Sequence, residues 1–149
     1  MLIQTTRFGP IEVDDAKIMS FKDGLLGFPN HHRFALLQTT ADPAFFWMQS
    51  VDDPDLAFVV CDPLLFVPDY QVPIRKDDVA ALALNDLNDC QVLVIVNKVN
   101  GDLTANLLGP LVVGAHSLQA KQLVLSDKRY GTRHRLVSAP TARTVAKTA

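Results

Sequence analysis

Residues 44–70 read AFFWMQSVDDPDLAFVVCDPLLFVPDY, two apolar runs separated by an acidic segment that contains a proline. In an extended chain alternate side chains point to opposite faces, so residues 45–50 and 56–61 would each be largely apolar on both faces. A sheet with one face in water would place a polar residue at every second position. The stretch therefore predicts two neighbouring strands, joined by the acidic loop, that are covered on both sides within a barrel or sandwich.

Short strand patterns recur along the rest of the chain, with glycine and proline marking the turns between them. The strongest tight-turn signal is Asn100-Gly101, which predicts a hairpin after the apolar run Cys90–Val96. Other predicted extended segments are Leu2–Thr5 and Ile11–Val13 as a first hairpin, Lys17–Phe21, Leu25–Phe28, Phe34–Gln38, Asp69–Ile74, and the closing strands Leu111–Val113 and Gln122–Leu125, with a loop over Gly114–Gln119.

One short helix is predicted between Pro73 and Cys90. Val79, Leu82 and Ala83 recur at the three- and four-residue intervals of a single apolar stripe, and Asp77 can cap the first turn of a helix over Asp78–Leu84. Taken with the strand pattern, this predicts a mainly β single domain, a barrel or a sandwich, with one short helix.

Charge divides the chain unevenly. Residues 1–127 contain all 16 acidic residues and eight of the 14 basic ones, a net charge of −8, whereas residues 128–149 have a net charge of +6. Low hydrophobicity and like charges predict that the end of the chain is disordered. We expect a barrel domain over residues 1–130 and a basic, disordered C-terminal tail over residues 131–149.

The acidic body disfavours direct binding of nucleic acid, because phosphates require a concentrated positive field. A basic protein partner suits this surface better. The chain shows no apolar run of about 18 residues and no signal-peptide pattern, so we expect a cytoplasmic protein that does not contact membranes. Cys61 and Cys90 stand singly in apolar strands, which favours buried, reduced thiols.

No motif of catalysis, cofactor binding or metal binding is found in the sequence, so we expect a protein that is not an enzyme and has no catalytic residue, cofactor or metal ion. His31 and His32 are adjacent and would face opposite ways on a strand, which favours exposed loop histidines. Asp52, Asp53 and Asp55 could hold a cation. A turn centred on Pro54 that exposes these carboxylates to water is the favoured interpretation.

The order of motifs along the chain resembles the flagellar assembly factor FliW family, over about residues 1–130. The most specific combination is QSVDDPDLAF at residues 49–58, followed downstream by LTANLLGP at residues 103–110 after an apolar strand and an Asn-Gly turn. The other matching residues are Phe21, Gly24, Leu26-Gly27-Phe28, Asp62-Pro63, Phe66, Pro68 and Tyr70.

The resemblance implies a compact, mostly antiparallel β-barrel-like domain that acts by binding proteins. Members of this family bind flagellin in the cytoplasm as a chaperone and also bind CsrA, an RNA-binding repressor of flagellin translation. The two partners compete, so that accumulated flagellin frees CsrA to silence the flagellin message. For this chain we therefore expect flagellin and CsrA as partners, no direct contact with nucleic acid, and a monomer in the free state.

The predicted partner-binding residues are Asp52, Asp53, Asp55, Asp69, Tyr70 and Asn106. The three loop carboxylates suit a basic protein, and tyrosine is enriched at interfaces. For Tyr70, a half-buried position in the barrel is an equally good interpretation. For Asn106 and its neighbour Thr104, turn chemistry inside the fold is favoured over binding.

Two other function classes fit a small β-barrel. A flavin-binding reductase would need a basic phosphate-binding cluster in the body, which the sequence lacks. A small RNA-binding barrel would need exposed aromatic and basic residues side by side, and apart from Tyr130 the aromatic residues lie in acidic or apolar surroundings. Both remain alternatives to the protein-binding interpretation.

Overall fold

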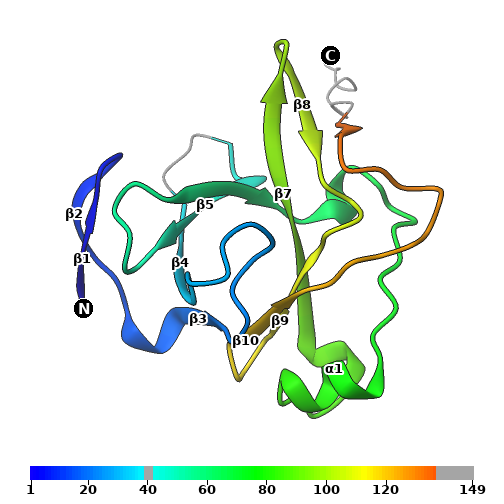
Figure 1. Cartoon of the computed structure of the whole chain (residues 1–149), viewed down its shortest axis with the longest axis horizontal. Helices are drawn as coiled ribbons and strands as arrows, with labels where there is room; N and C mark the ends of the chain where they lie inside the picture. The colour runs from blue at the N-terminus through cyan, green and yellow to red at the C-terminus, as the bar shows by residue number, and fades with distance from the viewer. Residues whose placement is uncertain (39–41, 137–149) are drawn as a thin grey trace.

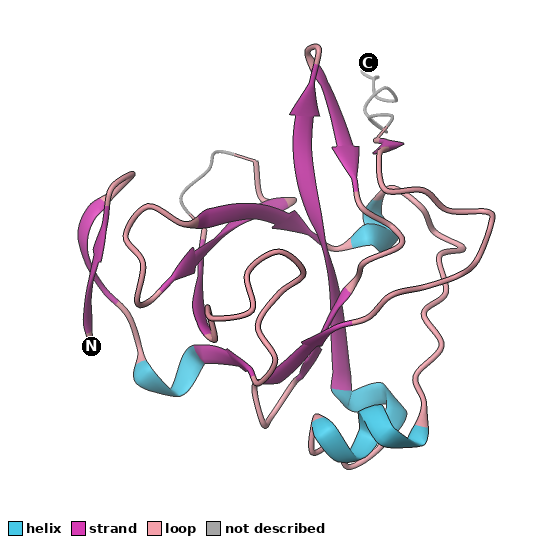
Figure 2. Ribbon diagram, viewed as in Figure 1, coloured by secondary structure: helices cyan, strands magenta, loops and turns pink. Residues whose placement is uncertain are grey.

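The computed structural model describes residues 1–38 and 42–136, which fold around a closed barrel of seven strands (Figure 1, Figure 2). The barrel closes in the order β7-β6-β5-β4-β3-β10-β9 and returns to β7, and all of its pairings are antiparallel except that of β3 with β10. The strands are β3 (Ile18–Phe21), β4 (Arg33–Leu37), β5 (Phe45–Ser50), β6 (Ala57–Cys61), β7 (Cys90–Val99), β9 (Leu111–Gly114) and β10 (Gln119–Gln122). The mainly β, barrel-like fold predicted from the sequence is confirmed.

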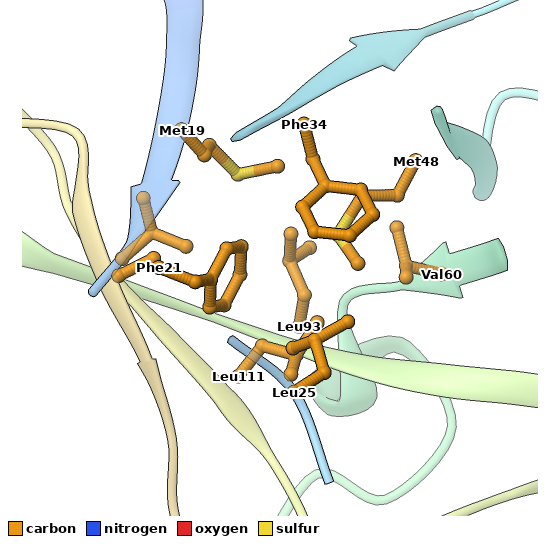
Figure 3. Packing of buried hydrophobic residues seen from close by; sticks show 10 residues of the cluster. Met19, Phe21, Leu25, Phe34, Met48, Val60, Leu93 and Leu111 are labelled. Carbon is orange, nitrogen blue, oxygen red and sulfur yellow. The ribbon is translucent and has the colours of Figure 1, made fainter. Parts of the chain in front are cut away.

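The central pair β5–β6 has one face inside the barrel. Met48 lies opposite Phe58 in the ladder, and Met48 and Val60 are fully buried. They pack with apolar side chains from the neighbouring strands, among them Phe34 of β4 and Leu93 of β7 (Figure 3). This cluster is the core that holds the barrel closed.

The opposite face of the same pair is covered as well. Trp47 packs under the hairpin of β1 (Leu2–Thr5) and β2 (Gly9–Glu12), where Arg7 lies 4.2 Å from the centre of its ring. Cys61 lies in a second apolar cluster formed with later parts of the chain. The two-sided apolar pattern of residues 44–61 is therefore explained by a core on each side of the sheet.

Strands β7 and β8 (Asp102–Ala105) form a hairpin that extends beyond the barrel (Figure 1). At its tip Asn100 and Gly101 have φ angles of 52° and 86°, the left-handed values that a tight hairpin turn requires. The turn predicted at these two residues is confirmed. The short strand β11 (His134–Arg135) pairs with β8.

The segment that follows residue 127 packs against the body as far as residue 136. The Tyr130 ring lies 4.8 Å from the Tyr70 ring, and Leu136 is buried in the second core cluster. The pairing of β11 with β8 thus lies within residues 131–136, which the sequence assigns to the tail. The remaining part of that tail, residues 137–149, lies outside the described residues, so its disorder stays a prediction.

Several predicted boundaries needed correction. Residues 25–28, expected to be extended, form a turn that hydrogen bonds between Leu25 and Phe28 close. The helix α1 spans Lys76–Ala81, and its first turn is capped by Asp78, which accepts a hydrogen bond from the Arg75 amide at 3.0 Å; Asp77 is exposed and does not cap it. Strand β10 ends at Gln122, where the closing strand was expected to begin. Residues 71–75 form no strand, because this segment packs through its side chains and pairs with no strand of the sheet.

Candidate functional site

The acidic loop between β5 and β6 is built around a buried amide. Gln49 is fully buried, and its Nε2 lies 3.1 Å from the carbonyl oxygens of both Ser50 and Leu56 and 3.3 Å from that of Asp53. These backbone carbonyl groups, which would otherwise need water as a hydrogen-bond donor, are thus oriented toward the Gln49 side chain. The Ser50 hydroxyl accepts the Asp53 amide at 3.0 Å. These contacts hold the loop in a single shape and turn its carboxylates outward.

Asp52 forms a two-point ion pair with Arg33 of β4. The Arg33 Nη2 lies 2.6 Å from Oδ1 and its Nε lies 3.3 Å from Oδ2. The hydrogen bonds from Arg33 lower the pKa of the Asp52 carboxyl. Because a guanidinium beside it offsets its charge, Asp52 contributes little net negative field to the surface.

Asp53 and Asp55 are arranged differently. Asp53 Oδ2 lies 3.1 Å from His31 Nε2, and its Oδ1 accepts the Asp55 amide at 3.0 Å, the local bond of an Asx turn. Asp55 accepts a hydrogen bond from the hydroxyl of Thr6 and is exposed, with no cation paired to it among the described residues. Asp55 is therefore the carboxylate of this loop with the least compensated charge.

Tyr70 lies inside the molecule, and only 6% of its surface is exposed. Its hydroxyl donates to the Leu107 carbonyl oxygen at 2.6 Å, and burial raises the pKa of this phenol. The neighbouring Asp69 is exposed and forms no ion pair with another described residue. Of the two, only Asp69 presents its side chain to a partner in this state.

Asn106 closes a turn. Its Oδ1 accepts the amides of Leu108 at 3.1 Å and Gly109 at 3.0 Å. A Cβ at position 109 would lie 2.9 Å from the Asn106 amide nitrogen, which excludes any residue larger than glycine without a shift of this side chain. Asn106 thus shapes the turn before β9, and these hydrogen bonds are local to that turn.

Sequence reasoning missed an apolar groove beside Tyr70. The groove has a volume of about 280 Å³. It is lined by Pro63, Leu64, Tyr70, Val72, Ile74, Cys90 and Val92. Leu64 and its neighbour Leu65, on the short 3-10 helix Pro63–Leu65, are 52% and 54% exposed. Exposed leucines next to an apolar groove are typical of a surface that binds another protein.

The available signal for this groove was the Asp62-Pro63 pair. The Asp62 Oδ1 accepts the Leu64 amide at 2.9 Å and starts the 3-10 turn, which directs the two leucines outward. The sequence does not indicate that Val72 and Ile74 complete the groove, because their position depends on how residues 71–75 pack. Likewise, no local pattern indicates that Arg33 and His31 lie beside the acidic loop, because their position depends on the β4–β5 register.

Chemically, these surfaces offer ionic and apolar contacts. Within the described ranges, no group of three or more histidine, cysteine or acidic residues is arranged to hold a metal ion. The thiol of Cys61 is fully buried, and burial raises its pKa to about 12, so it is protonated at neutral pH. None of the helices formed by the described residues has the length and apolar character needed to cross a membrane.

Comparison with known proteins gives one consistent result. A sequence model of the FliW protein family matches residues 2–136. The flagellar assembly factor FliW of Treponema denticola is 38% identical over 140 residues, covering 93% of this chain and 95% of that protein. The corresponding protein of Geobacter sulfurreducens is 40% identical over 136 residues, covering 90% of this chain and 85% of its own length.

A solved structure agrees with the sequence comparisons. The crystal structure of a flagellar assembly factor FliW superposes with a TM-score of 0.83 at 32% identity. The superposition covers 93% of this chain and 98% of that one. The likeness therefore spans the barrel, the projecting hairpin and the segment that leads to β11.

Proposed function

This chain belongs to the FliW family of flagellar assembly factors, and we propose that it acts in flagellum assembly by binding two proteins in turn, flagellin and CsrA. It serves as a cytoplasmic chaperone for flagellin and as an antagonist of CsrA, and it links the amount of flagellin to translation of the flagellin message. It works as a monomer that forms and breaks no covalent bond.

The apolar groove beside Tyr70 is the observation on which the flagellin part of the proposal rests. The ends of an unassembled filament subunit are apolar on one face and need cover, and an amphipathic helix binds by placing that face in a groove. The groove and the exposed Leu64 and Leu65 offer such cover. Asp62 and Asp69 border the groove in sequence and would meet polar or basic residues at the edge of the helix.

The acidic surface supports the CsrA part of the proposal. Opposite charges on two proteins speed their encounter and add little desolvation cost when the contacts stay at a wet rim. Residues 1–127 have a net charge of −8, and Asp55 and Asp69 are exposed carboxylates without a paired cation among the described residues. An RNA-binding repressor presents the complementary positive surface.

Because flagellin and CsrA compete for the chain, the amount of flagellin determines how much CsrA is free. While flagellin is abundant it occupies the chain, and CsrA remains free to repress translation. When flagellin is exported, the emptied chain captures CsrA and translation resumes. Asp69 and the groove lie on adjoining residues, so a partner at either one would hinder access to the other.

Calorimetric titration of flagellin into the chain tests the role of the groove. We expect Leu64→Ser to weaken flagellin binding about tenfold or more, because a leucine buried at an interface contributes about 1.5–3 kcal/mol. Leu2→Ser is the matched control, since Leu2 is 60% exposed on β1 and does not line the groove. Equal losses in the two variants would refute the assignment of the groove.

Salt dependence tests the CsrA contact. We expect affinity for CsrA to fall as ionic strength rises, because exposed charges are screened over about 8 Å at physiological salt. Flagellin binding through the groove serves as the internal comparison and should change much less. An affinity for CsrA that stays constant from low to high salt would contradict an electrostatic contact.

A further inference from the structure

The chain beyond β10 continues as an extended segment with one open edge. After Gln122 it runs through residues 123–127 before turning back toward β11 (Figure 1). The Leu123 amide donates to the Pro110 carbonyl oxygen at 2.9 Å, and the Leu125 amide donates to that of Leu108 at 2.8 Å. Both bonds point toward the turn that leads into β9.

Residues 124 and 126 point the other way. In an extended chain the backbone groups of successive residues alternate between the two edges. The backbone N–H and C=O groups of Val124 and Ser126 make no hydrogen bond within the described part of the chain. The Val124 side chain is 72% exposed, the largest exposed fraction among the large apolar side chains of the described residues. The segment thus offers the free backbone groups of a sheet edge.

A groove runs along this open edge. It has a volume of about 500 Å³, and residues 121–127 form one wall while Pro73, Arg75 and Asp78 form the other side. Proteins often protect such edges with a lysine that extends over them. Here Lys121 is instead held by the buried Asp78, with its Nζ 3.0 Å from Oδ1. Lys121 therefore does not extend over the open edge and does not protect it.

The two ends of the groove differ in charge. At one end lie Arg75 and the Lys121–Asp78 pair, and Arg75 forms no ion pair with a described residue. At the other end Asp127 is held by Arg129, with a shortest distance of 2.7 Å. Of the charged residues described as lining the groove, Arg75 is thus the one without an ion pair, and its amide donates to Asp78, which binds Lys121 at the N-terminal end of the edge.

From these observations we propose that residues 122–126 form a docking edge for an extended peptide segment, which adds as an antiparallel strand and places a carboxylate on Arg75. Antiparallel pairing is the slightly more stable arrangement, and it brings the C-terminal end of the incoming segment to Arg75. Backbone hydrogen bonds to Val124 and Ser126 supply affinity, and alternate side chains contact Val124 and Pro73. The inference does not depend on the identity of flagellin or CsrA as partners.

Nuclear magnetic resonance with the isotope-labelled full chain tests the proposal. The probe is a seven-residue peptide of alternating threonine and valine that ends in glutamate and is blocked at both ends. We expect its addition to shift the amide signals of Val124 and Ser126 and to slow their hydrogen exchange. A version of the peptide that is N-methylated at alternate residues keeps every side chain but loses the backbone N–H donors at those residues. We expect it to leave the amide signals of Val124 and Ser126 unchanged.

Variants of the chain separate backbone pairing from side-chain contact. Val124→Pro removes the amide at the edge and should abolish the shift at Ser126, whereas the matched Val124→Thr keeps the amide and should retain binding. Arg75→Gln should weaken binding of the glutamate peptide at least threefold and leave a peptide ending in glutamine unaffected.

Three results would overturn the proposal. The first is an absence of shifts at Val124 and Ser126 with the unmodified peptide. The second is equal binding of the N-methylated peptide, which would mean that backbone pairing plays no part. The third is concentration-dependent dimerisation in sedimentation that Val124→Pro abolishes, since the edge would then serve a second copy of the chain.

Discussion

The three carboxylates of the acidic loop present different amounts of charge to a partner. Asp52 is matched by the guanidinium of Arg33, and Asp53 lies against the His31 ring. The Asp55 carboxylate accepts a hydrogen bond from the neutral hydroxyl of Thr6 and forms no ion pair with a described residue. A basic partner that approaches this loop meets an uncompensated negative charge mainly at Asp55, although the sequence gives the three residues equal weight.

Neutralising single carboxylates should separate their roles in CsrA binding. We expect Asp55→Asn to weaken CsrA binding at low salt by a few-fold, since an exposed ionic contact contributes up to about 1 kcal/mol. Asp52→Asn should change affinity less, because it also frees the positive charge of Arg33. Fluorescence anisotropy with labelled CsrA measures both, and a larger effect of Asp52→Asn would contradict this ranking.

The buried thiol of Cys61 links stability to alkaline pH. Its pKa is raised by burial to about 12 in the folded chain, against an ordinary value of 9.0. Below pH 9 the thiol is protonated in both states; above it only the unfolded chain loses the proton, so stability falls until about pH 12. Above pH 9 the free energy of unfolding of the parent chain should therefore fall by up to about 1.4 kcal/mol per pH unit because of this thiol, and Cys61→Ala should remove that contribution. Urea unfolding from pH 7 to 11 tests it, and parallel curves would contradict it.

The helix α1 is attached to the barrel through one buried carboxylate, that of Asp78. Asp78 caps the helix through the Arg75 amide and binds Lys121 of β10, and so joins the helix to the barrel. Burial alone would raise the pKa of Asp78, but the hydrogen bonds from the Arg75 amide and Lys121 lower it overall. The charged form is therefore the one that stabilises the fold.

A matched pair of substitutions tests this element. We expect Asp78→Asn to reduce the free energy of unfolding by about 1–3 kcal/mol at pH 7. Asp77→Asn, on the exposed neighbour, should change it by less than about 0.5 kcal/mol. Because the lowered pKa stabilises the fold above the ordinary carboxyl range and the gain is lost as pH falls, the difference between the variants should shrink toward pH 3. A pH-independent difference would contradict the ionic contact.

Local patterns in the sequence predicted the elements whose cause is local. The Asn100-Gly101 turn and the two-sided apolar runs of β5 and β6 follow from turn geometry and alternation, and both are present. Asp77 was predicted as the cap, whereas Asp78 makes the hydrogen bond and also pairs with Lys121, which is distant in sequence. The groove at Leu64 could not be predicted for the same reason, since its other wall comes from residues 72–74.

At the scale of the whole molecule, the end of the described chain is part of the fold. Strand β11 pairs with β8, and Leu136 is buried in the second core cluster beside Tyr130. The Tyr130 hydroxyl accepts the Gln71 amide at 3.3 Å. This C-terminal segment therefore holds residues 66–72 and the groove beside Tyr70 in place.

Two truncations test this role. A chain that ends at Leu136 should unfold with the same free energy as the full chain to within about 0.5 kcal/mol. A chain that ends at Tyr130 loses the burial of Leu136 and the pairing of β11, and we expect it to be less stable by about 2–4 kcal/mol. Urea unfolding measures both. Equal stability of the two truncated chains would show that residues 131–136 add nothing to the fold.

The exchange of one protein partner for another is the step on which the proposed function depends. Its most direct test is a titration of flagellin into a preformed complex of the chain with fluorescently labelled CsrA, followed by anisotropy at low salt. We expect the anisotropy to fall to the value of free CsrA as flagellin is added, and the Leu64→Ser variant to require at least tenfold more flagellin. An unchanged anisotropy while flagellin binds would contradict it.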